Sequence, residues 1–172
     1  MGQGSGVKKI INLPLSKTML SDKSKEEIKR VLNKYPNKRS AAMDALRIAQ
    51  KEAGYLTGDV MREVADILGM PAAQVNEVAA FYTMYDKKPV GRYHIQVCTN
   101  VSCSLLGAEH VVEFLSRKLG IKKGETTPDK KVTLSVVECL GSCGTAPMMQ
   151  INDDYYENLT EEKIAEILKG LK

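Results

Sequence analysis

The four cysteines of the chain lie together between positions 98 and 143, and the first 97 residues contain none. Their pattern is Cys98-x4-Cys103, then 35 residues, then Cys139-x3-Cys143. No apolar run approaches the roughly 18 residues of a membrane span, and no signal-peptide core follows the first lysines, so we expect a reducing compartment. Clustered cysteines in such a compartment bind metal or do redox work more often than they form disulfides. The fold is therefore expected to bring these thiols together.

The first half of the chain has the apolar period of helices. Four helices are expected to begin at Ser24, Ser40, Thr57 and Pro71. Glu27 stands three residues after Ser24, which is the pattern of a capping box, and Tyr82 is expected on the inner face of the last helix. Short connections between such helices favour a compact bundle, so we assign residues 22–88 to one helical domain. Residues 1–21 are expected to form a mobile lead-in.

After Lys88 the pattern changes to the alternation that is typical of strands. The expected elements are a strand at Tyr93–Cys98, a helix over 105–119, a strand at Val132–Val137, a strand over 147–151 that turns into Tyr155-Tyr156, and a last helix capped by Thr160. Residues 89–172 thus form a second domain of α/β type. The predicted fold class is α+β, with a helical bundle followed by a sheet and its helices.

The strand–helix–strand order explains how two distant cysteine pairs can meet. Cys98 ends the first strand, and Cys103 is expected in the loop before the helix; Cys139 ends the second strand, and Cys143 follows in the next loop. Such a unit normally makes neighbouring parallel strands with a right-handed crossover. Parallel neighbours end at the same edge of the sheet, so both pairs are expected at one place. Four thiolates there suit an iron–sulfur cluster or zinc.

The intervals between the cysteines favour the cluster. Structural zinc sites commonly leave two residues between paired cysteines, whereas the intervals here are four and three. A two-iron cluster is larger than one ion and tolerates wider pairs. Gly141 and Gly144 flank Cys143 and would let backbone N–H groups approach the sulfurs. Spacing alone favours a 2Fe-2S cluster and leaves zinc, or thiol and disulfide chemistry, as alternatives.

Charge and composition exclude other functions. Residues 1–39 carry 10 Lys or Arg against 3 acids, whereas the remainder has a small acidic excess. Nucleic-acid modules spread basic residues over a folded face with aromatics, but this chain has no Trp and 2 Phe, so no nucleic-acid partner is expected. No Gly-rich phosphate loop follows a strand, which argues against a nucleotide site on this chain. His94 and His110 are isolated, and we expect them on the surface or in the core rather than as ligands.

These residues resemble a known family. The resemblance is carried by Val97-Cys98-Thr99-Asn100-Val101-Ser102-Cys103, by Glu138-Cys139-Leu140-Gly141-Ser142-Cys143-Gly144-Thr145-Ala146-Pro147, by the helix from Ala41 to Tyr55, and by Val78-Ala79-Ala80-Phe81-Tyr82-Thr83-Met84-Tyr85. Over residues 22–172 the sequence is similar to the thioredoxin-like 2Fe-2S subunit of the NADH-oxidising module of respiratory complex I. Related subunits occur in multimeric hydrogenases, including electron-bifurcating ones, and in NAD-linked formate dehydrogenases. The sequence does not discriminate among these hosts.

The resemblance implies a thioredoxin-like fold for residues 89–172 and one 2Fe-2S cluster whose ligands, one pair per iron, are Cys98, Cys103, Cys139 and Cys143. The implied partner is a larger iron–sulfur subunit that holds FMN and the NAD(P)H site, in a complex with further iron–sulfur subunits. The chain would then be the electron-transfer subunit of an oxidoreductase complex, such as an NADH dehydrogenase or a hydrogenase, with no complete active site of its own. Residues 22–88 would dock it to that partner. A cytoplasmic location is expected, at the cytoplasmic face of the membrane through the complex and without direct insertion.

Two interpretations from other classes stay open at this point. One is a free-standing thioredoxin-like ferredoxin that carries electrons, and the other is a zinc-stabilised interaction module without redox function. Position 142 is Ser where the family often has Ala. Its hydroxyl would either donate a hydrogen bond to a cluster sulfide or face solvent.

Overall fold

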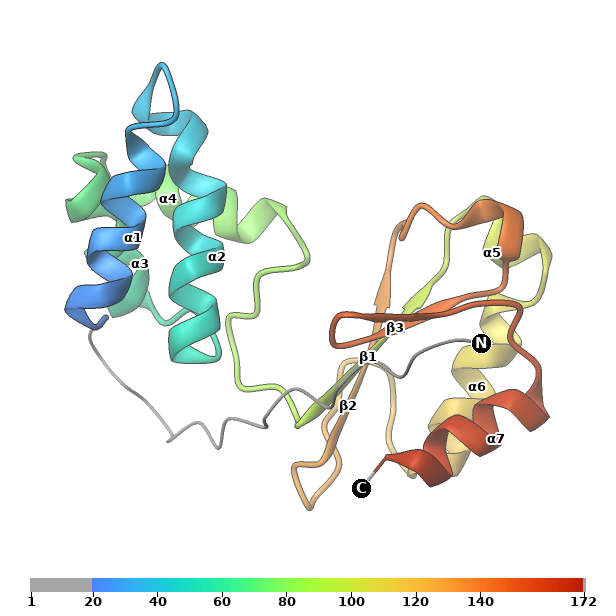
Figure 1. Cartoon of the computed structure of the whole chain (residues 1–172). Helices are drawn as coiled ribbons and strands as arrows, with labels where there is room; N and C mark the ends of the chain where they lie inside the picture. Colours follow the sequence, from blue (N-terminus) through green and yellow to red (C-terminus); the bar gives the residue numbers. More distant parts are fainter. Residues whose placement is uncertain (1–19, 172) are drawn as a thin grey trace, which may run out of the picture. The chain divides into compact units, whose positions relative to one another are not determined.

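The structure is a computed structural model that describes residues 20–171 (Figure 1). The described chain forms two compact units that divide between Lys88 and Pro89, the first helical and the second built around a sheet. This order of helices before a sheet confirms the predicted fold class. Of the predicted lead-in, residues 1–19 lie outside the described part, whereas Leu20 is buried in the first unit. No helix within residues 20–171 is both long enough and apolar enough to cross a membrane.

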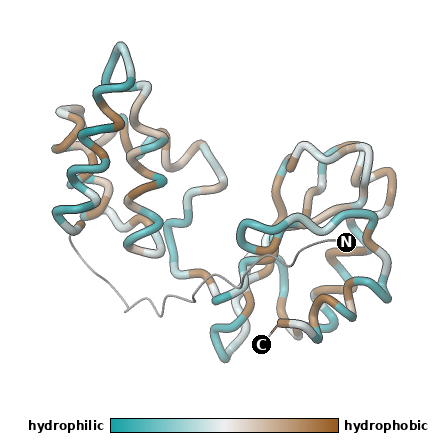
Figure 2. Tube along the Cα trace, in the orientation of Figure 1, coloured by the Kyte–Doolittle hydropathy of each residue, from teal (hydrophilic) through white to brown (hydrophobic). Residues whose placement is uncertain are grey.

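The first unit is a bundle of short helices. Its elements are α1 (Asp22–Leu32), the 3-10 turn η1 (Lys38–Ala41), α2 (Ala42–Ala53), α3 (Gly58–Leu68) and α4 (Ala72–Phe81). Hydrophobic and hydrophilic stretches alternate along these helices (Figure 2), as expected of helices that each bury one face. The side chains of Leu46, Val64 and Leu68 are fully enclosed in the shared core. Thr57 caps α3 as predicted, because its side chain accepts a hydrogen bond from the N–H of Val60.

Two helix starts and one packing prediction were wrong. Ser21, not Ser24, caps α1: the Ser21 side chain accepts a hydrogen bond from the N–H of Ser24. Ser40 lies inside η1, which Asn37 caps, and α2 begins only at Ala42. Tyr82 ends α4 and is 37% exposed rather than inward, because the backbone turns to an extended conformation there.

Replacing Ser21 by alanine is expected to lower the free energy of unfolding by about 1 kcal/mol, the usual effect of losing a helix N-cap. The Ser21 hydroxyl also donates to the Glu52 carboxylate at 2.9 Å, which ties the start of α1 to α2. Urea unfolding followed by circular dichroism measures this loss. The matched control is Ser24→Ala, which removes the hydroxyl that the sequence pattern favoured and should change stability by less than about 0.5 kcal/mol. The reverse order of the two losses would contradict the observed cap.

The second unit is a four-stranded sheet with helices. Its elements are β1 (Tyr93–Cys98), α5 (Val101–Leu105), α6 (Ala108–Leu119), β2 (Val132–Val137), the 3-10 turn η2 (Cys143–Thr145), β3 (Met149–Ile151), β4 (Asp154–Tyr156) and α7 (Glu161–Gly170). The strand order is β2-β1-β3-β4. β1 and β2 are parallel, in a register that pairs Tyr93 with Val132 and Cys98 with Val137. The other two pairings are antiparallel. The predicted parallel pair is thus present, and both of its strands end at one edge.

A core of its own holds this unit together. Ile95 of β1 and Leu134 of β2 are fully buried, and they pack in one cluster with Leu115 of α6 and Ile164 of α7. Helices α6 and α7 lie side by side (Figure 1). These four residues lie in elements that the sequence pattern predicted, whereas Ile121 and Leu159 of the same core lie outside them. The sheet edge that carries the cysteines is therefore fixed by a packed scaffold.

A close backbone approach requires glycine where the chain enters this unit. The N–H of Gly91 donates to the Thr133 hydroxyl at 2.6 Å, and a Cβ at position 91 would lie 2.8 Å from the backbone nitrogen of Val132. Gly91→Ala would push the start of β2 away, so we expect a loss of about 1–3 kcal/mol, the usual range for overpacking. Thermal unfolding measures it. Gly58→Ala is the control, since nothing lies within 4 Å of its Cβ position, and equal losses in both variants would contradict the steric reason.

Candidate metal centre

The four cysteines come from four places around the shared end of β1 and β2. Cys98 is the last residue of β1, Cys103 lies in α5, Cys139 follows β2 by two residues, and Cys143 opens η2. All four are free thiols. Two details of the prediction were wrong: Cys103 does not lie in a loop but in a short helix, and Cys139 does not end β2, whose last residue is Val137.

Two residues explain this short helix. The Asn100 side chain accepts a hydrogen bond from the N–H of Val101 and caps α5. Gly107, with φ of 94°, adopts the left-handed conformation and separates α5 from α6, so the predicted helix over 105–119 begins at Ala108 instead. Leu105, which the sequence pattern placed in that helix, is 82% exposed. The break lets α5 turn Cys103 inward toward β1.

The thiols from separate elements meet at this edge. Cys98 and Cys103 are buried in one small cluster with Ala108 and Met148, and the Cys103 and Cys139 thiols both act on the pKa of Cys98. Cys143 is close enough for its charge to act on Cys103. The parallel pairing of β1 and β2 is the cause, because it brings Cys98 and the loop after Val137 to the same end. The Cys98 thiol also donates to the carbonyl of Glu138 in that loop, at 3.8 Å.

The two cysteine pairs differ in burial. Cys98 and Cys103 are 3% and 2% exposed, whereas Cys139 and Cys143 are exposed. Burial and the hydrogen bond with Cys98 raise the pKa of Cys103 to about 11. Burial also raises the pKa of Cys98, but hydrogen bonds from the backbone at Asn100 and Leu140 and from the two thiols outweigh it, so the net pKa is lowered. A bound cation would compensate the burial of thiolate charge at both positions.

The donor set consists of four cysteine thiols, which suit either kind of metal centre. Within residues 20–171, no group of three or more His, Cys, Asp or Glu side chains is placed to hold a metal ion. A zinc site gathers its four ligands tetrahedrally around one point. A 2Fe-2S cluster has four cysteine ligands spread over two irons.

The loop that carries Cys139 and Cys143 is shaped by its backbone. The N–H of Gly141 donates to the Cys139 sulfur at 3.3 Å. Gly141 has φ of 78°, a conformation that side chains rarely adopt. This contact agrees with the expectation that glycine here brings an N–H to a sulfur. Donors of this kind stabilise thiolate and cluster charge.

A second set of contacts, which the sequence analysis missed, fastens the same loop from β4 and the residues after it. One Glu157 carboxylate oxygen accepts hydrogen bonds from the hydroxyls of Ser142 and Thr145. The Tyr155 hydroxyl donates to the carbonyl of Leu140 at 2.8 Å. The Ser142 hydroxyl therefore donates to a carboxylate of the protein itself. It neither faces solvent nor is left free to donate to a cluster sulfide, the two orientations that the sequence suggested. The only sequence signal for these contacts was the predicted turn into Tyr155-Tyr156.

The two histidines take no part in this site. The His94 ring lies 2.9 Å from the Ser135 hydroxyl, in the middle of the strands. His110 pairs with Glu161 at 2.7 Å, which joins α6 to α7. Neither ring contacts a cysteine thiol in these interactions. His94 thus contacts the neighbouring strand, and His110 connects two helices.

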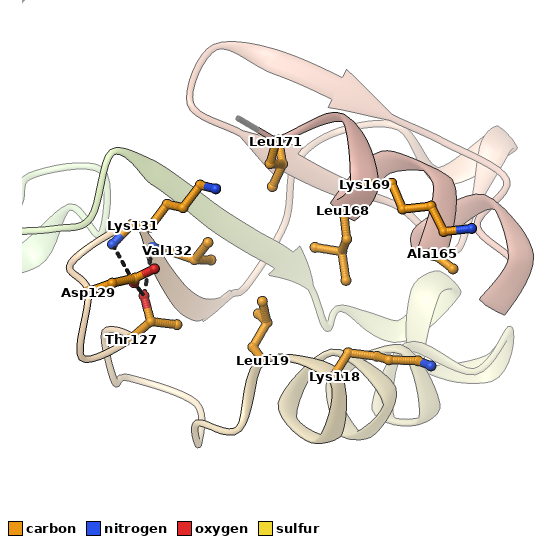
Figure 3. Close-up of a pocket in the computed structure, with 10 residues that line it drawn as sticks. All are labelled: Lys118, Leu119, Thr127, Asp129, Lys131, Val132, Ala165, Leu168, Lys169 and Leu171. Atoms are coloured by element: carbon orange, nitrogen blue, oxygen red, sulfur yellow. Dashed lines mark hydrogen bonds between the residues drawn. The ribbon is translucent and has the colours of Figure 1, made fainter.

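A cavity of about 440 Å³ lies at the other end of β2. It is lined by Val132, the first residue of that strand, and by the ends of α6 and α7. Figure 3 shows an apolar floor that includes Leu119 and Leu168, while the amines of Lys118 and Lys169 point away from it. The cavity is separated from the cysteines by the length of the strand. It brings no reactive group to the candidate site.

Apolar side chains are exposed beside the cysteines, on segments that contain no charged residue of their own, although Glu109, Glu138 and Glu157 lie next to these segments. On α5 and just after it, Val101 is 67%, Leu105 is 82% and Leu106 is 58% exposed. The segments 99–108 and 139–152 contain no charged residue, although 27% of the whole chain is charged. Both segments border the thiols. Uncharged, apolar surface of this kind is typical of the core of a protein–protein interface.

The fold and the four-thiol donor set define a small iron–sulfur protein with a thioredoxin-like domain, and comparison of the sequence with known families agrees. The chain belongs to the thioredoxin-like 2Fe-2S ferredoxin family, whose model matches residues 28–172. The predicted resemblance is thereby confirmed. An iron–sulfur cluster is the cofactor of this family, and the predicted electron-transfer class follows from it.

Curated relatives are similar over most of their length. The chain is 51% identical over 148 residues to an NADH-quinone oxidoreductase subunit from Rhizobium meliloti strain 1021, covering 86% of this chain and 88% of the relative. It is 43% identical over 165 residues to an NADH-quinone oxidoreductase subunit from Rickettsia conorii, covering 94% and 99%. These relatives are subunits of an oxidoreductase.

A solved structure shares the fold. The NAD⁺-reducing NiFe-hydrogenase in its air-oxidised state aligns with a TM-score of 0.65 at 22% identity. The alignment covers 76% of this chain and 22% of the hydrogenase chain, so this protein corresponds to about a fifth of that chain's length. At this identity the similarity establishes the fold.

Proposed function

We propose that Cys98, Cys103, Cys139 and Cys143 are the ligands of one 2Fe-2S cluster. The observation that supports the proposal is the parallel pairing of β1 and β2, which brings Cys98, buried beside Cys103, to the same end as the loop that carries Cys139. Cys143 completes a set of four on the loop that already holds Cys139. Each sequence pair would bind one iron. The bound cluster would accept and release one electron at a time.

We infer that the electron partner is a larger subunit that oxidises NAD(P)H with the help of FMN. The relatives are subunits of NADH-quinone oxidoreductase, and the structural neighbour is an NAD⁺-reducing hydrogenase. Nicotinamide cofactors deliver hydride, and a flavin is the usual cofactor that divides its two electrons for one-electron carriers. Further iron–sulfur subunits would receive the electrons. The location proposed is cytoplasmic, at the membrane face through the complex.

The exposed apolar side chains beside the cysteines support a subunit rather than a free-standing carrier. Weak, transient redox encounters use small interfaces, and complementary charge speeds them. A permanent subunit instead presents apolar surface to its partner, as Leu105 and its neighbours do here. A zinc-stabilised module is disfavoured by the intervals of four and three residues within the cysteine pairs, which are wider than structural zinc sites commonly use. The interpretation as an electron-transfer subunit therefore explains more of the observations than either alternative.

Anaerobic purification followed by iron, sulfide and zinc assays tests the proposal. We expect about two irons and two acid-labile sulfides per chain, and an EPR signal after dithionite reduction. Stoichiometric zinc without sulfide or signal would instead establish the zinc module. Purification under native conditions then shows whether a flavoprotein co-purifies with the chain that carries iron and sulfide. A loaded chain that always purifies alone would favour the free-standing carrier.

A further inference from the structure

A carboxylate next to the candidate cluster has no part in the proposed ligand set. Glu157 follows β4 and contacts the hydroxyl of Ser142, in the loop between Cys139 and Cys143, and that of Thr145, two residues after Cys143. The Ser142 and Thr145 hydroxyls both lie within hydrogen-bonding distance of one oxygen of this carboxylate, and of each other at 2.8 Å. Ser142 immediately precedes Cys143. The contact is thus one residue from a proposed iron ligand.

The surrounding contacts make this a fixed arrangement rather than a chance surface contact. The N–H of Asn158 donates to the carbonyl of Thr145 at 2.7 Å, and the Tyr155 hydroxyl donates to Leu140. The Lys163 amine donates to the backbone carbonyl of Glu157. The loop is therefore connected at three points to the segment 155–158. Glu157 makes the connection nearest to Cys143.

We propose that Glu157 is a positioning residue for the cluster: it holds Cys143 from both sides, through Ser142 before it and Thr145 after it, and its negative charge lowers the cluster's reduction potential. This inference rests on the proposed ligand set. Hydrogen bonds from Ser142 and then Thr145 lower the pKa of Glu157, so the carboxylate is ionised near neutral pH. A fixed negative charge disfavours the addition of an electron nearby. Lys163 is the facing cation and offsets part of the effect.

The arrangement also reverses the role that a hydroxyl at position 142 would otherwise have. A Ser142 hydroxyl that donated to a cluster sulfide would stabilise the reduced state and raise the potential. Here its hydrogen is directed to Glu157, which withholds that donor from the cluster. Glu157→Gln removes the negative charge but keeps an oxygen that can accept the Ser142 hydrogen bond. It therefore separates the effect of the charge from the effect of the hydrogen bond.

The test compares the midpoint potentials of the full-length, cluster-loaded chain in three forms: wild type, Glu157→Gln and Glu166→Gln. Glu166 is an exposed residue of α7, so its variant has the same change in net charge. We expect Glu157→Gln to favour reduction about tenfold, which is 59 mV upward for a one-electron couple, with iron and sulfide contents unchanged. Glu166→Gln should leave the potential at the wild-type value. Equal potentials in all three, or equal shifts in both variants, would overturn the inference.

A second variant keeps the inference testable if Glu157→Gln fails to load. Ser142→Ala combined with Thr145→Val removes both donors and leaves the carboxylate. If the loop needs this anchor, the double variant should lose iron as well, and full loading there would overturn the anchoring role. Failure of the ligand assignment is recognised separately, because the wild-type chain would then contain no iron and sulfide.

Discussion

Replacing Cys98 by serine is expected to abolish the cluster, with iron and sulfide falling from about two of each per chain to near zero. Cys98 is buried beside Cys103, and its thiol donates to the carbonyl of Glu138, which precedes Cys139, so it lies between the two cysteine pairs. A serine hydroxyl is close in size to the thiol but ionises far less readily, and thiolate is the form that binds metal. The EPR signal of the reduced protein should disappear with the iron. Cys143→Ser, in the other pair, should have the same effect.

Ser102→Ala is the matched control for these variants. Ser102 precedes Cys103 in the same short helix, and no side-chain hydrogen bond in α5 depends on its hydroxyl. Its iron content should match the wild type. Circular dichroism should show that each cysteine variant keeps its secondary structure, since the largest core of each unit contains no cysteine. Full iron content in Cys98→Ser would remove that residue from the ligand set.

Shortening the chain to residues 89–172 is expected to leave the cluster bound and to abolish co-purification with the flavoprotein. The second unit contains all four cysteines and a core of its own, so it has what the cluster requires. The first unit has a separate core and no cysteine, which leaves docking as its expected contribution. Tagged full-length and shortened chains, purified side by side from cells that make the flavoprotein, measure the difference. Iron assays show whether the shortened chain is loaded.

The reciprocal fragment, residues 1–88, provides the control. It should bind the flavoprotein without carrying iron. Partner recovery with an iron-loaded 89–172 fragment equal to that of the full chain would contradict the docking role of the helices. The apolar residues beside Cys103 would then be the sole attachment, because they remain in that fragment.

Much of the fold could be predicted because its largest elements carry strong local patterns. The alternation in Tyr93–Cys98 and Val132–Val137 predicted two strands, and chain topology made them parallel. That single inference also predicted that distant cysteines would meet. The sequence patterns failed where a contact from elsewhere decides the local structure. Ser21 caps α1 while Glu52 of α2 binds its hydroxyl, and no pattern around Ser24 and Glu27 contains that information.

The details of the site were harder to predict than its location. Helix α5 has only five residues, which is too short for an apolar period to be recognised. Its signals were Asn100 as a cap and Gly107 as a break, and either residue by itself is equally common in loops. Glu157 lies 14 positions beyond Cys143, and only the β3–β4 hairpin returns it to the loop. Such contacts follow from the folded sheet and have no signature along the chain.

Because the cysteines are unequally buried, the site has one side that faces the protein interior and one side that is exposed. Cys98 and Cys103 are enclosed by the protein, whereas Cys139 and Cys143 open to the outside. With iron bound, a second redox centre can come nearest from the open side, and one behind the sheet would be farther away by the thickness of the domain. The shortest electron route therefore enters and leaves on the same side. A cluster in such a position would suit the end or a side branch of a chain of redox centres rather than an intermediate position between two of them.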